Sequence, residues 1–412
     1  MEGRGRDFSW VLNKGEKDDS LAKKFFPDEV ANSTRNFHSQ IPGYERTPLV
    51  SLPKLAAHLG VGGIWVKNEA LRLGLNSFKV LGGSFALYKF IQDRLGMGDK
   101  EMSYDYLLSK EVKEKLGELT FAAATDGNHG RGVAWAAQKL GHKSVIYVHH
   151  ETSQRRIDAI ASYGARVEVV VGTYDDAVRQ VSLDAEKYGW EVISDTSWEG
   201  YTKVPTWIMQ GYMTMMIEAQ EQFVEAGVPK PTHLFVQAGV GALAAAAVGY
   251  YYSQFGKDAP KCIVVEPEKA YCLYKSALKG DGQAHAAEGD LSTIMAGLAC
   301  GEPSELAWAI LKDSVDVFLS LPDYTAARAM RVYAAPVAGD PQIISGESGA
   351  APLGALLTLV CDKEESEMHK HLGLNAESQI LLINSEGDTD PIMFRQIVWE
   401  GSNCVPEDYY LE

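Results

Sequence analysis

Residues 120–148, TFAAATDGNHGRGVAWAAQKLGHKSVIYV, contain a short apolar strand pattern, a polar turn, a helical pattern and a second strand pattern. This alternation of short strands and longer helices continues to Ser194, through turns that mostly contain glycine. Such alternation is typical of βαβ units, whose parallel strands are covered by helices on both faces. The stretch therefore predicts an α/β fold built on an open, doubly wound sheet.

The same pattern extends toward the C-terminus. The expected strands cover residues 120–124, 143–148, 166–171, 191–194, 233–236, 262–266 and 380–384. The expected helices cover residues 130–139, 154–163, 174–188, 206–226 and 323–333, and the Ala-rich residues 240–252 predict a further, buried helix. The polar residues 195–203 interrupt the alternation, so we expect a domain boundary there.

The composition restricts the class of protein. The chain has 412 residues, of which 46% are hydrophobic and 23% charged, and these are ordinary values for a soluble folded protein. Its formal net charge of −16 argues against nucleic acid as a partner, because phosphates attract a basic surface. Five cysteines without a CxxC pair indicate neither a disulfide scaffold nor a zinc site, and the charged N-terminus lacks a secretory signal. We therefore expect a cytoplasmic protein that binds neither a metal nor a membrane.

A lysine in an apolar setting is the first candidate for chemistry. The motif Asn76-Ser77-Phe78-Lys79 precedes an apolar helical pattern that starts near Phe85. Partial burial lowers the pKa of an amine, which makes the amine nucleophilic and able to form a Schiff base. The alternative is a lysine whose stem packs on the surface while its ammonium reaches water, and this is the commoner arrangement for a single lysine.

Three further motifs follow expected strands. They are Thr125-Asp126-Gly127-Asn128-His129-Gly130, Gln237-Ala238-Gly239-Val240-Gly241-Ala242 and Asn384-Ser385-Glu386-Gly387-Asp388-Thr389. The carboxyl ends of parallel strands carry the ligand sites of α/β sheets, where helix N-termini bind carboxylates and phosphates. Each motif also fits an ordinary turn with polar caps and glycines that relieve backbone strain. The second motif lacks the third glycine of the dinucleotide fingerprint, so hydride chemistry is not predicted.

Taken together, the order and setting of these four motifs resemble the fold type II pyridoxal-phosphate enzymes, the family of threonine dehydratase, serine racemase and the cysteine synthases. The resemblance runs from about Tyr44 to Asp390. It implies pyridoxal 5'-phosphate as the cofactor, held between two open, doubly wound sheets. It also implies a large domain of residues 1–83 and 201–412, a small domain of residues 84–200, and a homodimer.

The resemblance also implies roles for single residues. Ser77-Phe78-Lys79 is similar to the Schiff-base motif of the family, so Lys79 is expected to bind the cofactor and act in catalysis. The cofactor-binding residues that it implies are Lys79, Asn128 at the ring oxygen, Gly239, Val240, Gly241 and Ala242 at the phosphate, and Ser385 at the pyridine nitrogen. The substrate-binding residues that it implies are Ser77, Thr125, Asp126 and Asp195.

The sequence departs from the dehydratase pattern at two places, and at both it resembles the diaminopropionate ammonia-lyases. The carboxylate loop has Asp126 before Gly127-Asn128, and the phosphate loop is AGVGA instead of four glycines. The similarity to these ammonia-lyases extends to residues 194–201, 345–349 and 386–390. It implies β-elimination of both D- and L-2,3-diaminopropionate to pyruvate and two ammonia, with Lys79 and Asp126 as bases on opposite faces of the substrate. Asp195 would assist at the amine.

The two acids, Asp126 and Asp195, also have a physical reason to bind the substrate, independent of the resemblance. Buried carboxylates such as Asp126 and Asp195 can pair with the second ammonium of the substrate and reject a neutral hydroxyl. Asp195 could instead cap the strand end before Trp198.

One alternative function is a threonine or serine dehydratase or a racemase on the same fold, and Asp126 argues against it. Another is a catalytically silent metabolite-binding relative, against which the presence of Lys79 argues.

Overall fold

The computed structural model describes residues 2–4, 8–13, 17–98, 100–125, 127–150, 152–361 and 366–407. Its strands are β1 (Glu2–Arg4), β2 (Ser9–Leu12), β3 (Leu49–Ser51), β4 (Gly63–Asn68), β5 (Thr120–Thr125), β6 (Lys143–His149), β7 (Arg166–Val170), β8 (Glu191–Val192), β9 (His233–Gln237), β10 (Lys261–Pro267), β11 (Val317–Leu321) and β12 (Gln379–Asn384). Its α-helices are α1 (Ser20–Phe25), α2 (Asp28–Ser39), α3 (Pro53–Leu59), α4 (Lys79–Arg94), α5 (Tyr104–Leu107), α6 (Lys110–Leu116), α7 (Asn128–Leu140), α8 (Gln154–Ala161), α9 (Tyr174–Tyr188), α10 (Lys203–Glu225), α11 (Ala242–Phe255), α12 (Cys272–Lys279), α13 (Glu305–Leu311), α14 (Asp323–Ala334), α15 (Glu347–Cys361), α16 (Glu367–Leu372) and α17 (Pro391–Val398). Three short 3₁₀ helices are η1 (Glu69–Gly74), η2 (Gly256–Asp258) and η3 (Ala296–Leu298).

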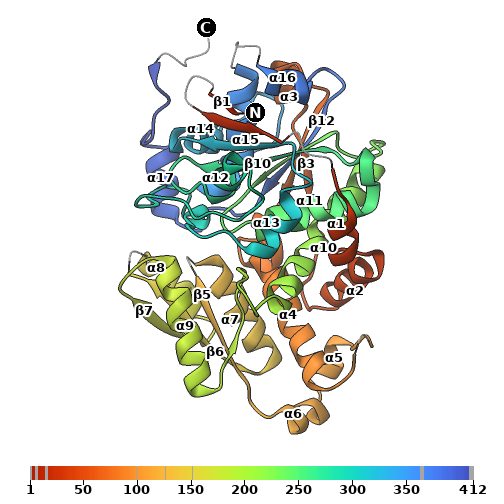
Figure 1. Ribbon diagram of the computed structural model, residues 1–412, viewed down its shortest axis with the longest axis vertical. Coiled ribbons are helices and arrows are strands. Elements are labelled where there is room, and N and C mark those ends of the chain that lie inside the picture. The colour runs from red at the N-terminus through yellow and green to blue at the C-terminus, as the bar shows by residue number, and fades with distance from the viewer. Residues whose placement is uncertain are drawn as a thin grey trace.

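Two separate sheets organise the chain (Figure 1). A four-stranded parallel sheet has the order β7-β6-β5-β8, and an eight-stranded sheet has the order β1-β2-β11-β10-β9-β12-β4-β3. The centre of the larger sheet is parallel, whereas β1, β2 and β3 at its two edges pair antiparallel. In Figure 1 the larger sheet lies in the upper half of the molecule and the smaller sheet lies below it. The predicted α/β class is confirmed, and the antiparallel edge strands are an addition that the sequence pattern did not predict.

The elements expected from the sequence are present. The seven expected strands correspond to β5 to β10 and β12, and the expected helices correspond to α7, α8, α9, α10, α11 and α14. Residues 120–192 build the smaller sheet, and strands from residues 2–68 and 233–384 build the larger one. The division into a large domain and a small domain of residues 84–200 stays a prediction, and α4 spans the first of its boundaries.

Helix α4, which begins at Lys79, packs closely against α7 and α10. A Cβ on Gly132 of α7 would lie 2.9 Å from the amide nitrogen of Val80, and a Cβ on Gly211 of α10 would lie 2.5 Å from the carbonyl oxygen of Leu81. Main-chain atoms cannot move away as the end of a side chain can, so only glycine permits this close approach. The first turn of α4 is therefore held between a helix that covers the smaller sheet and the long helix α10.

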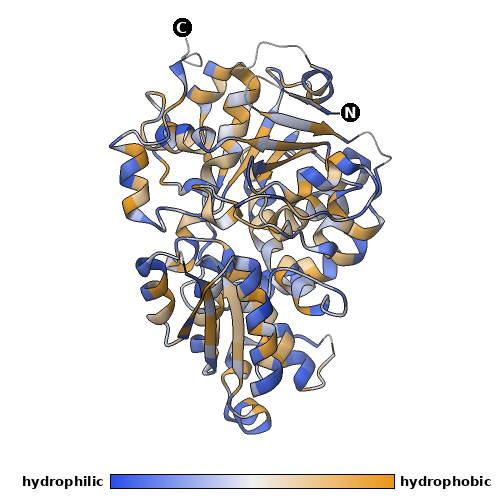
Figure 2. Ribbon diagram, turned by 60° about the vertical axis from the view of Figure 1, so that its left-hand side comes forward, coloured by the Kyte–Doolittle hydropathy of each residue, from blue (hydrophilic) through white to orange (hydrophobic). Residues whose placement is uncertain are grey.

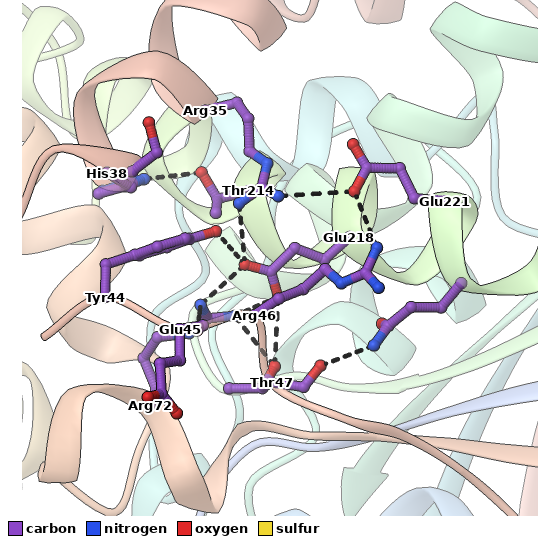
Figure 3. A network of polar contacts seen from close by, with 12 residues as sticks. Arg35, His38, Tyr44, Glu45, Arg46, Thr47, Arg72, Thr214, Glu218 and Glu221 are labelled. Atoms are coloured by element: carbon purple, nitrogen blue, oxygen red, sulfur yellow. Dashed lines mark hydrogen bonds and ion pairs between the residues drawn. The ribbon is translucent and has the colours of Figure 1, made fainter. Parts of the chain in front are cut away.

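A buried network of charged side chains joins α10 to β4 and η1. The carboxylate of Glu218 accepts hydrogen bonds from Lys67 at 2.6 Å and from Arg72 at 2.7 Å, and Arg72 also pairs with Glu69 at 2.7 Å. Figure 3 shows the part of this network in which Glu218 contacts Arg72 and Tyr44. All four side chains are fully buried, and two cations balance two anions. Because η1 ends five residues before Lys79, the network fixes the start of the segment that leads to this lysine.

Apolar residues concentrate in the strands and on the helix faces that cover them. Figure 2 shows hydrophobic colour along the strands of the smaller sheet, with blue and orange residues mixed on the helices around them. Every residue of β9 and of β11 is buried, and so is most of α11, as expected for residues 240–252. Within the described ranges, no helix is both long enough and apolar enough to cross a membrane.

Candidate active site

One cavity brings together most of the residues that the sequence predicted for the site. Its walls come from the end of β9, from residues that follow β8 and β12, from the first turns of α4, α7, α9, α11 and α15, and from η3. The space between these walls, counted out to the open mouth and including open solvent, is about 650 Å³. The predicted residues in the lining are Lys79, Asn128, Asp195, Gly239, Val240, Gly241, Ala242 and Ser385.

The amine of Lys79 is held by a buried carboxylate. Lys79 Nζ lies 2.5 Å from Oδ2 of Asp195, Tyr174 donates its hydroxyl hydrogen to Oδ1 at 3.1 Å, and His129 Nδ1 lies 4.0 Å from Oδ2. Burial by itself raises the pKa of the Asp195 carboxyl, but the charges of Lys79 and His129 outweigh burial and hold this pKa well below its usual range. Asp195 is therefore an anion at neutral pH and fixes the position of the Lys79 amine.

The turn between β9 and α11 presents backbone amides to the cavity. Within the described residues, the amides of Gly239, Val240 and Gly241 donate to no backbone acceptor, and they lie at the N-terminus of α11. Gly241 has a φ of +101°, and a Cβ on Gly239 would lie 3.1 Å from Cys300 Sγ. Amides at a helix N-terminus are the usual binding site of a phosphate. These residues fit the phosphate of pyridoxal phosphate.

Ser385 follows β12, and its side chain lies in the cavity wall. Gln237 Nε2 donates a hydrogen bond to Ser385 Oγ at 2.7 Å, so the hydroxyl hydrogen of Ser385 is available to a second acceptor. An unprotonated ring nitrogen is such an acceptor. Because a hydroxyl is neutral, this pair fits a pyridine ring without a positive charge on its nitrogen.

Asn128 is the first residue of α7, and it reaches the cavity from the smaller sheet. Its Nδ2 donates to Oε2 of Glu386 at 2.5 Å, so its amide connects the smaller sheet to the segment that follows β12. The preceding Asp126, predicted as the second base, lies outside the described residues.

Thr125 and Ser77, which the resemblance assigned to substrate binding, do not line the cavity. The hydroxyl of Thr125 accepts hydrogen bonds from the amides of Gly127 at 2.8 Å and Gly130 at 3.0 Å, at the start of α7. The hydroxyl of Ser77 accepts one from the amide of Lys79 at 3.3 Å. Both side chains are buried, and in this structure they hold the backbone that carries lining residues.

Among the lining residues that were given no role from the sequence are His129, Tyr174, Gln237 and Glu386. His129, Gln237 and Glu386 lie inside motifs that were recognised, directly beside residues with an assigned role. Tyr174 is the first residue of an expected helix. All four lie near a strand end or a helix start. The same kind of position indicated the residues that were predicted from the sequence.

Comparison with known proteins gives a consistent result. The family model for pyridoxal-phosphate dependent enzymes matches residues 41–371. The diaminopropionate ammonia-lyase of Salmonella typhimurium is 46% identical over 376 residues, which cover 91% of this chain and 93% of that protein. The crystal structure of the holo diaminopropionate ammonia-lyase from Escherichia coli is 43% identical, with a TM-score of 0.89 over 98% of this chain and 100% of that chain. A second structure of the Escherichia coli enzyme, in complex with an aminoacrylate–pyridoxal phosphate azomethine reaction intermediate, has a TM-score of 0.87 and 43% identity over 98% of this chain and 100% of that chain.

Proposed function

This chain belongs to the family of pyridoxal-phosphate dependent enzymes, and on that premise we propose that it eliminates ammonia from 2,3-diaminopropionate to give pyruvate and two ammonia. The observation that carries the proposal is the cavity itself. It places the Lys79 amine against the Asp195 carboxylate, and its wall includes the amides that begin α11. The diaminopropionate ammonia-lyases named above, which match the chain over nearly its whole length, support the choice of substrate.

The cofactor site follows from these residues. When bound to Lys79, pyridoxal phosphate supplies an electron sink for the negative charge that develops at the α-carbon of the substrate. The residues that would hold it are Gly239, Val240, Gly241 and Ala242 at the phosphate, Asn128 at the ring oxygen and Ser385 at the ring nitrogen.

Proton transfer at the α-carbon is the chemical task of the side chains. Lys79 takes the α-proton on one face of the substrate, and the Asp195 anion 2.5 Å away stabilises the ammonium that Lys79 then carries. Asp126 is the base for the opposite face, so both D- and L-diaminopropionate are substrates. The role of Asp126 rests on the sequence motif in which it precedes Gly127-Asn128.

The test is a product assay on the purified protein reconstituted with pyridoxal phosphate. We expect both enantiomers of diaminopropionate to yield pyruvate and ammonia in a ratio of one to two, with much slower turnover of serine and threonine. Turnover of serine or threonine in preference to diaminopropionate would identify a dehydratase and refute the proposal. A protein that binds no cofactor would instead be a silent relative.

Assembly and location are further parts of the proposal. The protein is a homodimer of the cytoplasm, as the family resemblance, the few cysteines and the net charge of −16 suggest. Light scattering on the purified holoenzyme tests the dimer, since a monomeric mass would contradict it. Cell fractionation tests the location.

A further inference from the structure

Glu386 has a rigidly fixed backbone at the wall of the cavity. It follows Ser385 at the end of β12, and it pairs with Ser77 as an isolated antiparallel bridge. Its carbonyl oxygen accepts a hydrogen bond from the amide of Gly346 at 3.0 Å, and the next amide, of Gly387, donates to Asn76 at 3.1 Å. The backbone of Glu386 is therefore fixed against the segment that leads to Lys79 and against the segment before α15.

The carboxylate of Glu386 is buried among neutral partners. It is 3% exposed, and it accepts hydrogen bonds from Asn128 Nδ2 at 2.5 Å, from the Ser348 amide at 3.2 Å and from the Thr389 hydroxyl at 3.4 Å. No basic side chain forms an ion pair with it in the part of the chain that the structure describes. A buried carboxylate without a cation is unfavourable, because hydrogen bonds from neutral groups replace only part of its hydration.

The other described carboxylate of the cavity is different. Asp195 already has a cation, since Lys79 Nζ lies 2.5 Å from it. Both carboxylates line the cavity into which a substrate would enter. Of the two, Glu386 is the one whose charge still lacks a cationic partner.

The surroundings of Glu386 leave no room for another side chain. A Cβ on Gly346 would lie 3.0 Å from Glu386 Oε1, and a Cβ on Gly349 would lie 2.8 Å from its carbonyl oxygen. The neighbouring Glu347 is also buried, and burial together with the charge of Glu386 raises the pKa of Glu347 to about 8. Glu347 is thus mostly neutral at pH 7, and of these two neighbouring residues it is Glu386 that lines the cavity.

We propose that Glu386 binds the second ammonium group of the substrate and so selects a diamino acid over serine. The inference rests on the proposed function, because it assigns the group that distinguishes diaminopropionate from serine. An ammonium gives the buried carboxylate the cation that its protein partners do not provide. A hydroxyl at the same place would leave that charge without a partner, and this penalty is the source of selectivity.

The test compares Glu386→Gln with the wild-type holoenzyme. The measured quantities are kcat/KM for diaminopropionate and the inhibition constant of serine as a competitor of that reaction, which is defined whether or not serine is turned over. We expect kcat/KM for diaminopropionate to fall by about tenfold or more, and the inhibition constant of serine to change by less than about twofold. Equal weakening of both ligands would make Glu386 a positioning residue for Asn128 and overturn the proposal, as would no change in either.

Glu347→Gln is the matched control, because Glu347 is equally buried, adjacent and mostly neutral at pH 7. It should leave the kinetics with both ligands unchanged. Glu386→Asp keeps the carboxylate, so it should keep the preference for diaminopropionate over serine, at lower rates. This variant replaces Glu386→Gln in the test if Glu386→Gln does not fold. Loss of that preference in Glu386→Asp would overturn the proposal.

Two further outcomes separate the inference from its premise. A wild-type enzyme that does not turn over diaminopropionate refutes the proposed function, whereas an active wild type with an unselective Glu386→Gln variant refutes only the inference. An activation by K⁺ that Glu386→Gln lacks would assign an inorganic cation to this carboxylate and overturn the proposal. The absorbance band of the bound cofactor, measured for each variant, confirms that the compared proteins are loaded equally.

Discussion

Replacing Glu218 by glutamine removes one charge from the buried network of α10, β4 and η1. Glu218 holds Lys67 at 2.6 Å and Arg72 at 2.7 Å, and all three side chains are fully buried. The substitution leaves two buried cations with Glu69 as their remaining anion. Breaking such a pair by removal of one partner destabilises proteins by about 3–5 kcal/mol. We expect a loss of this size in the free energy of unfolding, measured by urea denaturation of the holoenzyme at pH 7.

The pKa of Glu218 independently indicates a similar contribution of its charge to the free energy of unfolding. Burial raises this pKa, but the hydrogen bonds and charges of Arg72 and Lys67 outweigh burial and lower it from 4.5 to about 2. At about 1.4 kcal/mol per pKa unit, this shift stabilises the fold by about 3 kcal/mol. Because the pKa is lowered in the folded state, the stabilisation is complete above pH 4.5 and is lost as the pH falls toward 2. The difference between wild type and Glu218→Gln should therefore shrink as the pH falls below 4.5.

Glu221→Gln is the control on the same helix. The Glu221 side chain is 44% exposed and pairs with Arg35 at 3.5 Å and Arg46 at 3.4 Å. Solvent screens such pairs, so the expected loss is below about 0.5 kcal/mol. The reasoning is refuted if Glu218→Gln is destabilised no more than Glu221→Gln, or if its deficit grows as the pH falls from 5 to 3.

Four further predictions concern the cavity. Lys79→Ala should lose turnover and the absorbance of the covalently bound cofactor, and a borohydride-reducible linkage in this variant would contradict the assignment. Asp126→Asn should lower turnover of D-diaminopropionate by about a hundredfold or more and turnover of the L-isomer less, whereas equal losses would exclude two bases. Ser385→Asp should favour a protonated ring nitrogen and raise transamination relative to elimination, and an unchanged product ratio would place Ser385 away from that nitrogen. Gly239→Ala should weaken cofactor binding about tenfold in a titration of the apoenzyme, because the added Cβ lies 3.1 Å from Cys300 Sγ, and unchanged affinity would show that this loop does not hold the phosphate.

The regular elements were predictable where local signals agree. Helix α9 covers Tyr174–Tyr188 as expected, because Thr173 forms a capping box with Asp176 and Gly189 ends the helix with a left-handed φ of +69°. Strands β1, β2 and β3 were missed because three or four residues are too short to show a period of two. Strand β11 was missed because a short apolar run does not distinguish a buried strand from part of a buried helix.

Strand β4 escaped prediction for a different reason. Its sequence GIWVKN contains Lys67, and a lysine in a strand normally indicates an exposed face. Here Lys67 is fully buried, because Glu218 neutralises it from a position 151 residues away in the sequence. A partner at that separation has no local signature, so the burial of Lys67 becomes visible only in the folded chain.

In the candidate site, too, local motifs were predictable and contacts between distant segments were not. Lys79, Asn128 and Ser385 were located because each stands at a strand end or a helix start within a recognisable motif. The pairing of Lys79 with Asp195, and of Asn128 with Glu386, was not predictable, because it depends on how the two sheets face each other. The sequence placed Glu386 beside Ser385 but contained no sign that its carboxylate would be buried.

Glu218 and Glu386 are both buried carboxylates, and the source of the compensating charge separates their roles. Glu218 receives its cations, Lys67 and Arg72, from the chain itself, so removing its charge should affect stability at every substrate concentration. Glu386 receives only neutral donors from the described residues, so its charge is already uncompensated in the free enzyme. Its replacement by glutamine should therefore leave the free enzyme at least as stable as before and weaken the complex with a cationic substrate. A loss of stability in Glu218→Gln without a loss in Glu386→Gln is the outcome that this distinction requires.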